Sequence, residues 1–98
     1  MNDLLFSERA LTDLQRLADF LWATDPHAAE ATATVIFDAL EILLHSPEIG
    51  RKVRAGNREL VISRGHTGYL ALYKFLPTKS QVLVLALRHQ REAGYKSL

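Results

Sequence analysis

The chain has 98 residues, of which 48% are hydrophobic and 23% charged, with a net charge of +1 at pH 7. This length predicts a single domain, 1–98, because so short a chain buries enough surface for only one core. The lack of cysteine excludes a disulfide framework, thiolate chemistry and a cysteine–zinc site. The sequence has no basic leader and no long apolar run, which predicts a cytoplasmic protein with no membrane partner.

The first half of the chain predicts a short strand followed by two helices. Residues 3–6 (DLLF) form an apolar stretch typical of a strand. Ser7 is a helix N-cap candidate, and apolar residues at helical spacing continue to about residue 24. An Asp-Pro pair at 25–26 favours the start of a second helix, and a Ser-Pro pair at 46–47 stops it. The tight connection predicts an antiparallel αα-hairpin.

The second half of the chain predicts strands. Residues 46–57 are expected to form a loop with basic side chains, and strand patterns follow at 58–63, 69–76 and 81–88. Turn-rich links of four or five residues separate these strands, which favours hairpins. The predicted fold class is therefore α+β: a short N-terminal strand, an αα-hairpin and a three-stranded antiparallel meander.

The last strand raises the question of what covers the sheet. Its residues from Val82 to Leu87 are all apolar, which is typical of a strand covered on both faces. Two helices cover only one face, so the other face exposes apolar side chains unless something covers it. We expect either a protein partner or the chain's own residues 90–98, with Gly94 allowing Tyr95 to turn back towards the sheet.

The small net charge conceals an asymmetry between the two halves. Residues 1–50 carry two basic and nine acidic side chains, whereas residues 51–98 carry ten basic and two acidic ones. One explanation is that the second half presents a basic surface to an anionic partner. The other is that carboxylates collect on the helices and basic residues on the strands without a partner. Both explanations stay open.

Four segments carry a resemblance to a known family: FSERALTDLQRLADFLW (6–22), RELVI (58–62), GYLALYKF (68–75) and VLVLALRHQRE (82–92). In this order they are similar to the RelE/ParE superfamily of toxins from bacterial type II toxin–antitoxin pairs, which includes plasmid stabilisation proteins. The resemblance implies an α+β domain wrapped by a cognate antitoxin, commonly as a heterotetramer. Some members resemble ribosome-dependent mRNA endonucleases, and others poison DNA gyrase without nuclease activity.

Metal-free RNA cleavage requires a base, an acid and cations that stabilise the charged phosphorane. His89 titrates in a suitable range, and Tyr95 is able to stack on a base or transfer a proton. In the nuclease branch, histidines and tyrosines near the C-terminus act with arginines on the strands, and the matching positions are Arg64, His89 and Tyr95. No clear partner base follows, because Glu59 lies on a predicted strand and Glu92 comes after the motif.

The basic side chains of the second half are candidates for contacts with an antitoxin or target, or for holding a phosphate. They are Lys52, Arg54, Arg58, Arg64, Arg88 and Arg91. The alternative for His89 is a residue that ends a strand, its ring hydrogen-bonded to a loop. Histidine spacing matches no metal site, so no metal is predicted, and no cofactor is expected.

Five aromatic residues are expected to pack rather than to bind ligands. Trp22, Phe37 and Phe75 are predicted to lie in the core between helices and sheet. Tyr69 and Tyr73 share one face of the middle strand. That face is either core packing, which we favour, or a platform on which nucleotides stack.

The resemblance leaves three functions open. The first is a non-catalytic, ParE-like toxin that inhibits DNA gyrase, favoured by the near-zero net charge and the missing second catalytic group. A nuclease draws much of its affinity from neutralised phosphates, whereas a protein target makes no such demand. The second is a RelE-like, ribosome-dependent mRNA endoribonuclease. The third is an inactive member that only binds its antitoxin.

Overall fold

The computed structural model describes the backbone of residues 2–22, 25–64 and 67–96, without the side chains of 20–22, 28–29, 63–64 and 67. The elements are β1 (Asp3–Phe6), α1 (Glu8–Trp22), α2 (Pro26–Glu41), β2 (Arg51–Lys52), β3 (Arg58–Arg64), β4 (Thr67–Leu76) and β5 (Gln81–His89). Short 3₁₀ turns lie at Ile42–Leu44, Arg54–Gly56 and Pro77–Lys79. Within the described residues, no helix is long and apolar enough to cross a membrane.

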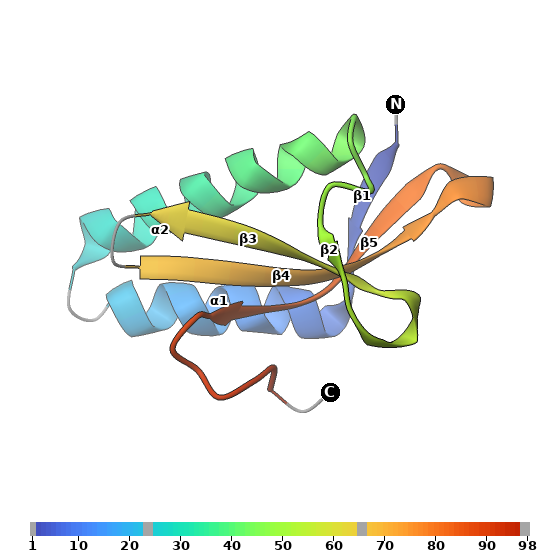
Figure 1. Cartoon of the computed structure of the whole chain (residues 1–98). Coiled ribbons are helices and arrows are strands. Elements are labelled where there is room, and N and C mark those ends of the chain that lie inside the picture. The colour runs from blue at the N-terminus through green and yellow to red at the C-terminus, as the bar shows by residue number, and fades with distance from the viewer. Residues whose placement is uncertain (1, 23–24, 65–66, 97–98) are drawn as a thin grey trace.

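The strands form one sheet in the order β1–β5–β4–β3–β2 (Figure 1). Strands β3, β4 and β5 are the predicted antiparallel meander, which confirms the α+β fold class. Strand β1 pairs with β5 in parallel, from Asp3 opposite Gln81 to Phe6 opposite Val84. Strand β2 was missed: it lies inside the predicted loop 46–57, and its two charged residues show no apolar alternation.

Ser7 joins the first helix to the sheet. Its hydroxyl oxygen accepts the Ala10 N–H at 3.0 Å, which caps α1 as predicted. The same hydroxyl donates to the Leu85 carbonyl at 2.8 Å, and the Ser7 N–H donates to the Val84 carbonyl at 2.9 Å. Helix α1 therefore starts at a point fixed against β5, and both helices pack their apolar stripes onto one face of the sheet. The buried residues of that core are Ala10, Leu17, Ile36, Leu40, Leu43, Ile62, Tyr69, Ala71, Tyr73, Val82, Val84 and Leu87.

Some sequence expectations differ from the structure at the helices. Helix α2 ends at Glu41, before the stop predicted at residues 46–47, and the 3₁₀ turn Ile42–Leu44 follows it directly. Of the three aromatic residues assigned to the core, Phe75 packs against it, and the side chain of Trp22 lies outside the described residues. The prediction for Phe37 is wrong, because the residue is 41% exposed and meets Phe6 edge-on, with ring centroids 5.9 Å apart. Phe37 follows the buried Ile36 by one residue and so turns away from the core. The predicted end of the first helix near residue 24 lies outside the described residues.

The two tyrosines of β4 are core residues, which confirms the packing interpretation. Tyr69 is 4% exposed and Tyr73 is fully buried. The Tyr73 hydroxyl donates to the Pro47 carbonyl at 2.8 Å and accepts the Gly50 N–H at 2.9 Å. A side chain at Gly50 has no room, since its Cβ would lie 2.6 Å from the Tyr73 hydroxyl oxygen. Tyr73 thus holds the loop before β2 against the sheet.

The chain's own C-terminal segment, residues 90–96, returns to the face of the sheet opposite the helices (Figure 1). On that face Ala86 is fully buried. The Tyr95 hydroxyl donates to Glu59 Oε2 at 2.6 Å, which places the end of the segment over β3. Val61 on the same face remains 55% exposed. The protein therefore covers part of this second face itself and leaves the part near Val61 open.

The link between β2 and β3, residues 53–57, contains a β-turn with Ala55 and Gly56 at its centre. Ala55 has φ 60° and ψ 29°, and Gly56 has φ 73°, so both lie in the left-handed region. The Asn57 N–H donates to the Arg54 carbonyl at 3.1 Å, and the Val53 N–H to the Asn57 carbonyl at 2.9 Å. Such turns match the twist of the flanking strands, but alanine is strained in the left-handed region.

We predict that Ala55→Gly raises the free energy of unfolding by about 0.5–1 kcal/mol, because relief of left-handed strain exceeds the added entropy of the unfolded chain. Urea unfolding measures the change. Ala31→Gly in α2 is the matched control and is expected to lower the free energy of unfolding by about 0.5–1 kcal/mol. Destabilisation by both substitutions would show that the turn is not strained.

Candidate functional site

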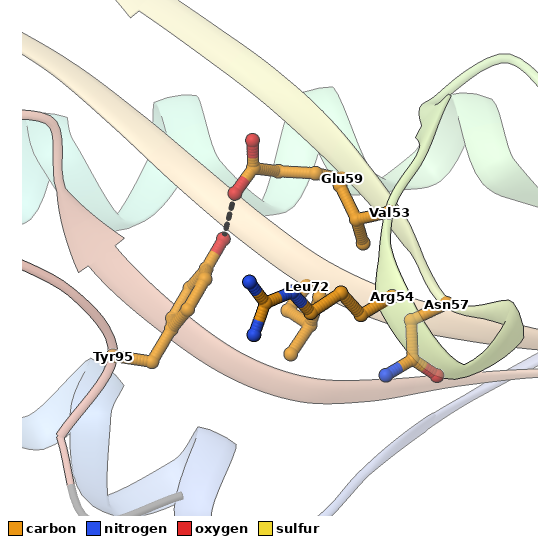
Figure 2. Close-up of a pocket in the computed structure, with 6 residues that line it drawn as sticks. All are labelled: Val53, Arg54, Asn57, Glu59, Leu72 and Tyr95. Carbon is orange, nitrogen blue, oxygen red and sulfur yellow. Dashed lines mark hydrogen bonds between the residues drawn. The ribbon is translucent and has the colours of Figure 1, made fainter.

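A cavity of about 460 Å³ lies on the second face of the sheet. Figure 2 shows its lining in front of the strands, with the helices passing behind them. The lining residues are Val53, Arg54, Asn57, Glu59, Leu72 and Tyr95. Turn Arg54–Gly56 places Arg54 at one side, and the C-terminal segment places Tyr95 at the other. The cavity opens to solvent and is lined by segments that lie about forty residues apart in the sequence.

Glu59 is the charged centre of this cavity. It is 5% exposed, although it lies on a strand face without helices. Its Oε1 accepts the Arg51 Nε–H at 2.9 Å and also pairs with the Arg51 guanidinium end, while its Oε2 accepts the Tyr95 hydroxyl. Burial opposes ionisation of Glu59, but the hydrogen bonds from Tyr95 and Arg51 and the attraction of Arg51 and Arg88 outweigh it. The pKa of Glu59 therefore lies below its ordinary value, and the group is an anion at neutral pH.

The same contact shifts the pKa of Tyr95 in the opposite direction. Its burial, followed by its hydrogen bond to Glu59 and the charge of Glu59, raises the pKa of the Tyr95 phenol well above its usual range. The guanidinium carbon of Arg88 lies 5.2 Å from the centre of the Tyr95 ring, a cation–π distance. Tyr95 is therefore a neutral hydrogen-bond donor, held between a carboxylate and a guanidinium.

The structure separates His89 from Tyr95. His89 pairs with Tyr69 across the β4–β5 ladder, and the two rings meet edge-on with centroids 5.3 Å apart. Tyr69 lies on the helical face of the sheet, whereas Tyr95 and Glu59 lie on the other face. The Nδ1 atom of His89 accepts the Arg91 N–H at 3.1 Å. His89 thus makes the contacts expected of a residue that ends a strand.

Only some of the predicted basic residues lie at the cavity. Arg54 lines the cavity, and Arg88 lies beside it on Tyr95. Arg58 instead donates to the carbonyls of Glu48 and Gly50, both at 2.9 Å, and so holds the loop before β2. The remaining candidates are Lys52 and Arg91, which are exposed, and Arg64, which ends β3 and whose side chain lies outside the described residues. The functional roles assigned to all of them stay predictions.

Glu59 and Asn57 are site residues that the sequence reasoning missed. Glu59 was set aside because it lies on a strand, yet its partner Tyr95 follows 36 residues later. A usable signal existed, because Glu59 is one of only two carboxylates in a half with ten basic residues. Asn57 has a buried side-chain oxygen without a hydrogen-bond partner.

These groups support binding better than proton transfer. Efficient acid–base catalysis uses groups whose pKa lies near the working pH. At the cavity the phenol is held neutral and the carboxylate is held ionised. The guanidinium groups and the apolar floor formed by Leu72 and Val53 are suited to contacts with an anionic or partly apolar molecule. Among the residues described, no group of three His, Cys, Asp or Glu side chains gathers as metal ligands would.

Comparisons with known proteins all match this chain to toxins of one superfamily. A family model described as "ParE toxin of type II toxin-antitoxin system, parDE" matches residues 4–94. The chain is 30% identical over 92 residues to Toxin RelE3 of Caulobacter vibrioides, covering 94% of this chain and 98% of that toxin. It is 34% identical over 79 residues to Toxin RelE1 of the same species, covering 81% of this chain and 85% of that toxin.

Two solved structures share the fold. The chromosomal ParDE system from P. aeruginosa matches with a TM-score of 0.73 at 20% identity, covering 89% of this chain and 94% of that one. The intact E. coli RelBE toxin–antitoxin complex matches with a TM-score of 0.61 at 25% identity, over the same shares of the two chains. The relatives thus bear both ParE and RelE names.

We predict that Glu59→Gln lowers the free energy of unfolding at pH 7 by about 1–3 kcal/mol, because it removes charge-assisted hydrogen bonds. It should also flatten the acid limb of the stability profile. A carboxylate whose pKa is lower in the folded protein stabilises the fold at pH values above its unfolded-state pKa, near 4.5. This contribution is lost as the pH falls through the pKa of the folded protein.

Denaturant unfolding between about pH 6 and pH 3 measures this slope. Glu48→Gln is the matched control, because Glu48 is 68% exposed in its 3.5 Å ion pair with Arg58. It should leave the slope near that of the unmodified protein. Equal slopes for Glu59→Gln and the unmodified protein would contradict the assignment of a lowered pKa to Glu59.

Proposed function

Since this chain belongs to the RelE/ParE superfamily of toxins from type II toxin–antitoxin systems, we propose that it arrests growth by binding DNA gyrase, without cutting RNA. We further propose that a cognate antitoxin holds it inactive in the cytoplasm. The gyrase target follows from the ParE-like members that the sequence resembles, and the family model that matches residues 4–94 is a ParE model.

One observation carries this proposal: the two candidates for proton transfer, His89 and Tyr95, lie on opposite faces of the sheet. A nuclease of the predicted kind needs both groups at one phosphate, because each transfers a proton in the same displacement. The raised pKa of Tyr95 also makes its phenol a poor proton donor near pH 7. A toxin that acts by binding a protein needs neither group to titrate.

Exposed apolar side chains on both sides of the sheet support a protein partner. Large apolar side chains are exposed on β1, α1, α2 and β3 and in the nearby turns, and they are Leu5, Leu11, Phe37, Ile42, Ile49 and Val61. Basic residues dominate the second half of the chain. An antitoxin segment that combines apolar and acidic residues fits both features. Its apolar residues would bury the exposed apolar side chains, and its acidic residues would pair with the basic ones. The ParDE and RelBE relatives are toxin–antitoxin assemblies.

An mRNA endoribonuclease is the second candidate, and the cavity favours it. Arg54 and Arg88 lie there beside Tyr95 and Glu59, and two guanidinium groups are suited to holding a phosphate. The relatives named Toxin RelE3 and Toxin RelE1 agree with this branch. An inactive member that only binds an antitoxin is the third possibility.

The test expresses the chain alone from a repressible promoter and measures growth, transcript integrity and the supercoiling activity of purified gyrase. We expect growth arrest with intact transcripts and inhibited supercoiling. Tyr95→Phe and His89→Ala should retain this activity, because neither hydroxyl nor imidazole does chemistry. His45→Ala, at an exposed histidine outside the cavity, is the control for His89→Ala.

The two alternatives give different results. Transcripts cut on ribosomes, with cutting reduced about 10²–10⁴-fold by Tyr95→Phe, would replace the gyrase proposal with the nuclease. Unimpaired growth, with a stable and folded protein in the cell, would leave the inactive antitoxin-binding member.

A further inference from the structure

A chain of charged groups connects helix α1 to the end of β5. Asp13 is fully buried, and its Oδ2 accepts the Leu87 N–H at 3.0 Å. Strand β1 pairs with β5 only as far as Val84, so Asp13 supplies the partner that a neighbouring strand would otherwise provide. Arg16, one turn along α1, places its Nη2 3.5 Å from both Asp13 Oδ1 and the Leu87 carbonyl.

The same arginine reaches the turn that follows β5. Arg16 Nη1 donates to Glu92 Oε2 at 2.9 Å, and Glu92 Oε1 accepts the His89 N–H at 2.9 Å. The Glu92 carbonyl accepts a hydrogen bond from Arg88 Nη1 at 2.7 Å. Both carboxylate oxygens of Glu92 are therefore engaged, one by the helix and one by the strand end. Burial by itself raises the pKa of Glu92, but the hydrogen bond from the His89 N–H, followed by the hydrogen bond and charge of Arg16 and the charge of Lys96, brings this pKa below its ordinary value.

Tyr95 follows Glu92 by three residues and ends on the other face of the sheet (Figure 2). So short a link leaves Tyr95 little freedom once residue 92 is fixed. We propose that Arg16 is a positioning residue: through Glu92 it holds the C-terminal segment so that Tyr95 forms one wall of the cavity and stays bonded to Glu59. Helix α1 thereby controls a cavity on the face of the sheet that it does not touch.

The charge distribution supports this role. Arg16 is one of two basic residues among the first fifty, and Glu92 is one of two acidic residues among the rest. Each residue is opposite in charge to most of its own half, and the two form an ion pair. Their side chains are 34% and 19% exposed, whereas Lys96, which also forms an ion pair with the Glu92 carboxylate, is 57% exposed and lies 3.8 Å from it. The shorter and less exposed pair is the one that joins helix and segment, and it is screened less by solvent. The inference does not depend on the proposed target.

The absence of cysteine makes the cavity easy to probe. Leu72→Cys places a single thiol in the cavity lining, and its rate of reaction with a water-soluble thiol reagent reports how well the C-terminal segment covers it. Tyr95→Ala in this background confirms that the thiol senses the segment and should accelerate labelling.

Arg16→Gln and Glu92→Gln are each expected to accelerate labelling about fivefold or more, and their combination no further, because both remove one contact. Arg16→Lys keeps the charge and should restore most of the protection. Lys96→Gln is the matched control and should change the rate less than about twofold. Glu92→Gln lies in a surface turn, so it tests the contact without altering helix α1.

A second reporter separates positioning from a general loss of stability. Ala71→Cys places the thiol on the fully buried helical face of β4, where labelling requires opening of the core. Arg16→Gln should accelerate labelling at residue 72 and leave labelling at residue 71 unchanged. Equal acceleration at both positions would overturn the proposal, as would an unchanged rate at residue 72 when Tyr95→Ala raises it.

Discussion

The hydrogen bond from Tyr95 to Glu59 is the contact on which the second face of this sheet depends. Both helices pack on one face, so the opposite face must expose apolar side chains, recruit a partner or be covered by the chain itself. The C-terminal segment takes the third course over part of that face. It does so around a buried carboxylate, which is stable there because Arg51 and Tyr95 both donate to it. The side chains that cover this part of the face are therefore also side chains that line the cavity.

Charge connects this arrangement to the two halves of the sequence. The acidic first half and the basic second half each contain two residues of the opposite sign. In the second half, Glu59 accepts a hydrogen bond from Tyr95, and Glu92 forms an ion pair with Arg16 of helix α1. Both carboxylates are thus used internally to fasten the C-terminal segment. Other basic residues of this half, among them Arg54 and Lys52, remain exposed.

The periodic elements were predictable from sequence, and the site was only partly so. Apolar spacing was enough to predict the helical hairpin and the meander, because each pattern is local. Strand β2 was missed because Arg51 and Lys52 pair through their backbone and show no apolar alternation. Arg54 was singled out as a binding candidate and Tyr95 as a catalytic one, but Glu59 was set aside, since its role depends on a contact 36 residues away. The placement of His89 on the helical face follows from strand register, which periodicity alone does not determine.

The central claim is that Tyr95 lies against Glu59 in the isolated protein, and the titration of its phenol tests this most directly. Tyrosine labelled with ¹³C at Cζ gives one resonance for each of the three tyrosines, and Tyr95→Phe identifies the one that belongs to residue 95. The account predicts that Tyr95 ionises well above the value near 10 of an exposed tyrosine, because burial and the Glu59 carboxylate both disfavour the phenolate. Ionisation near 10 would show that the C-terminal segment does not cover the sheet.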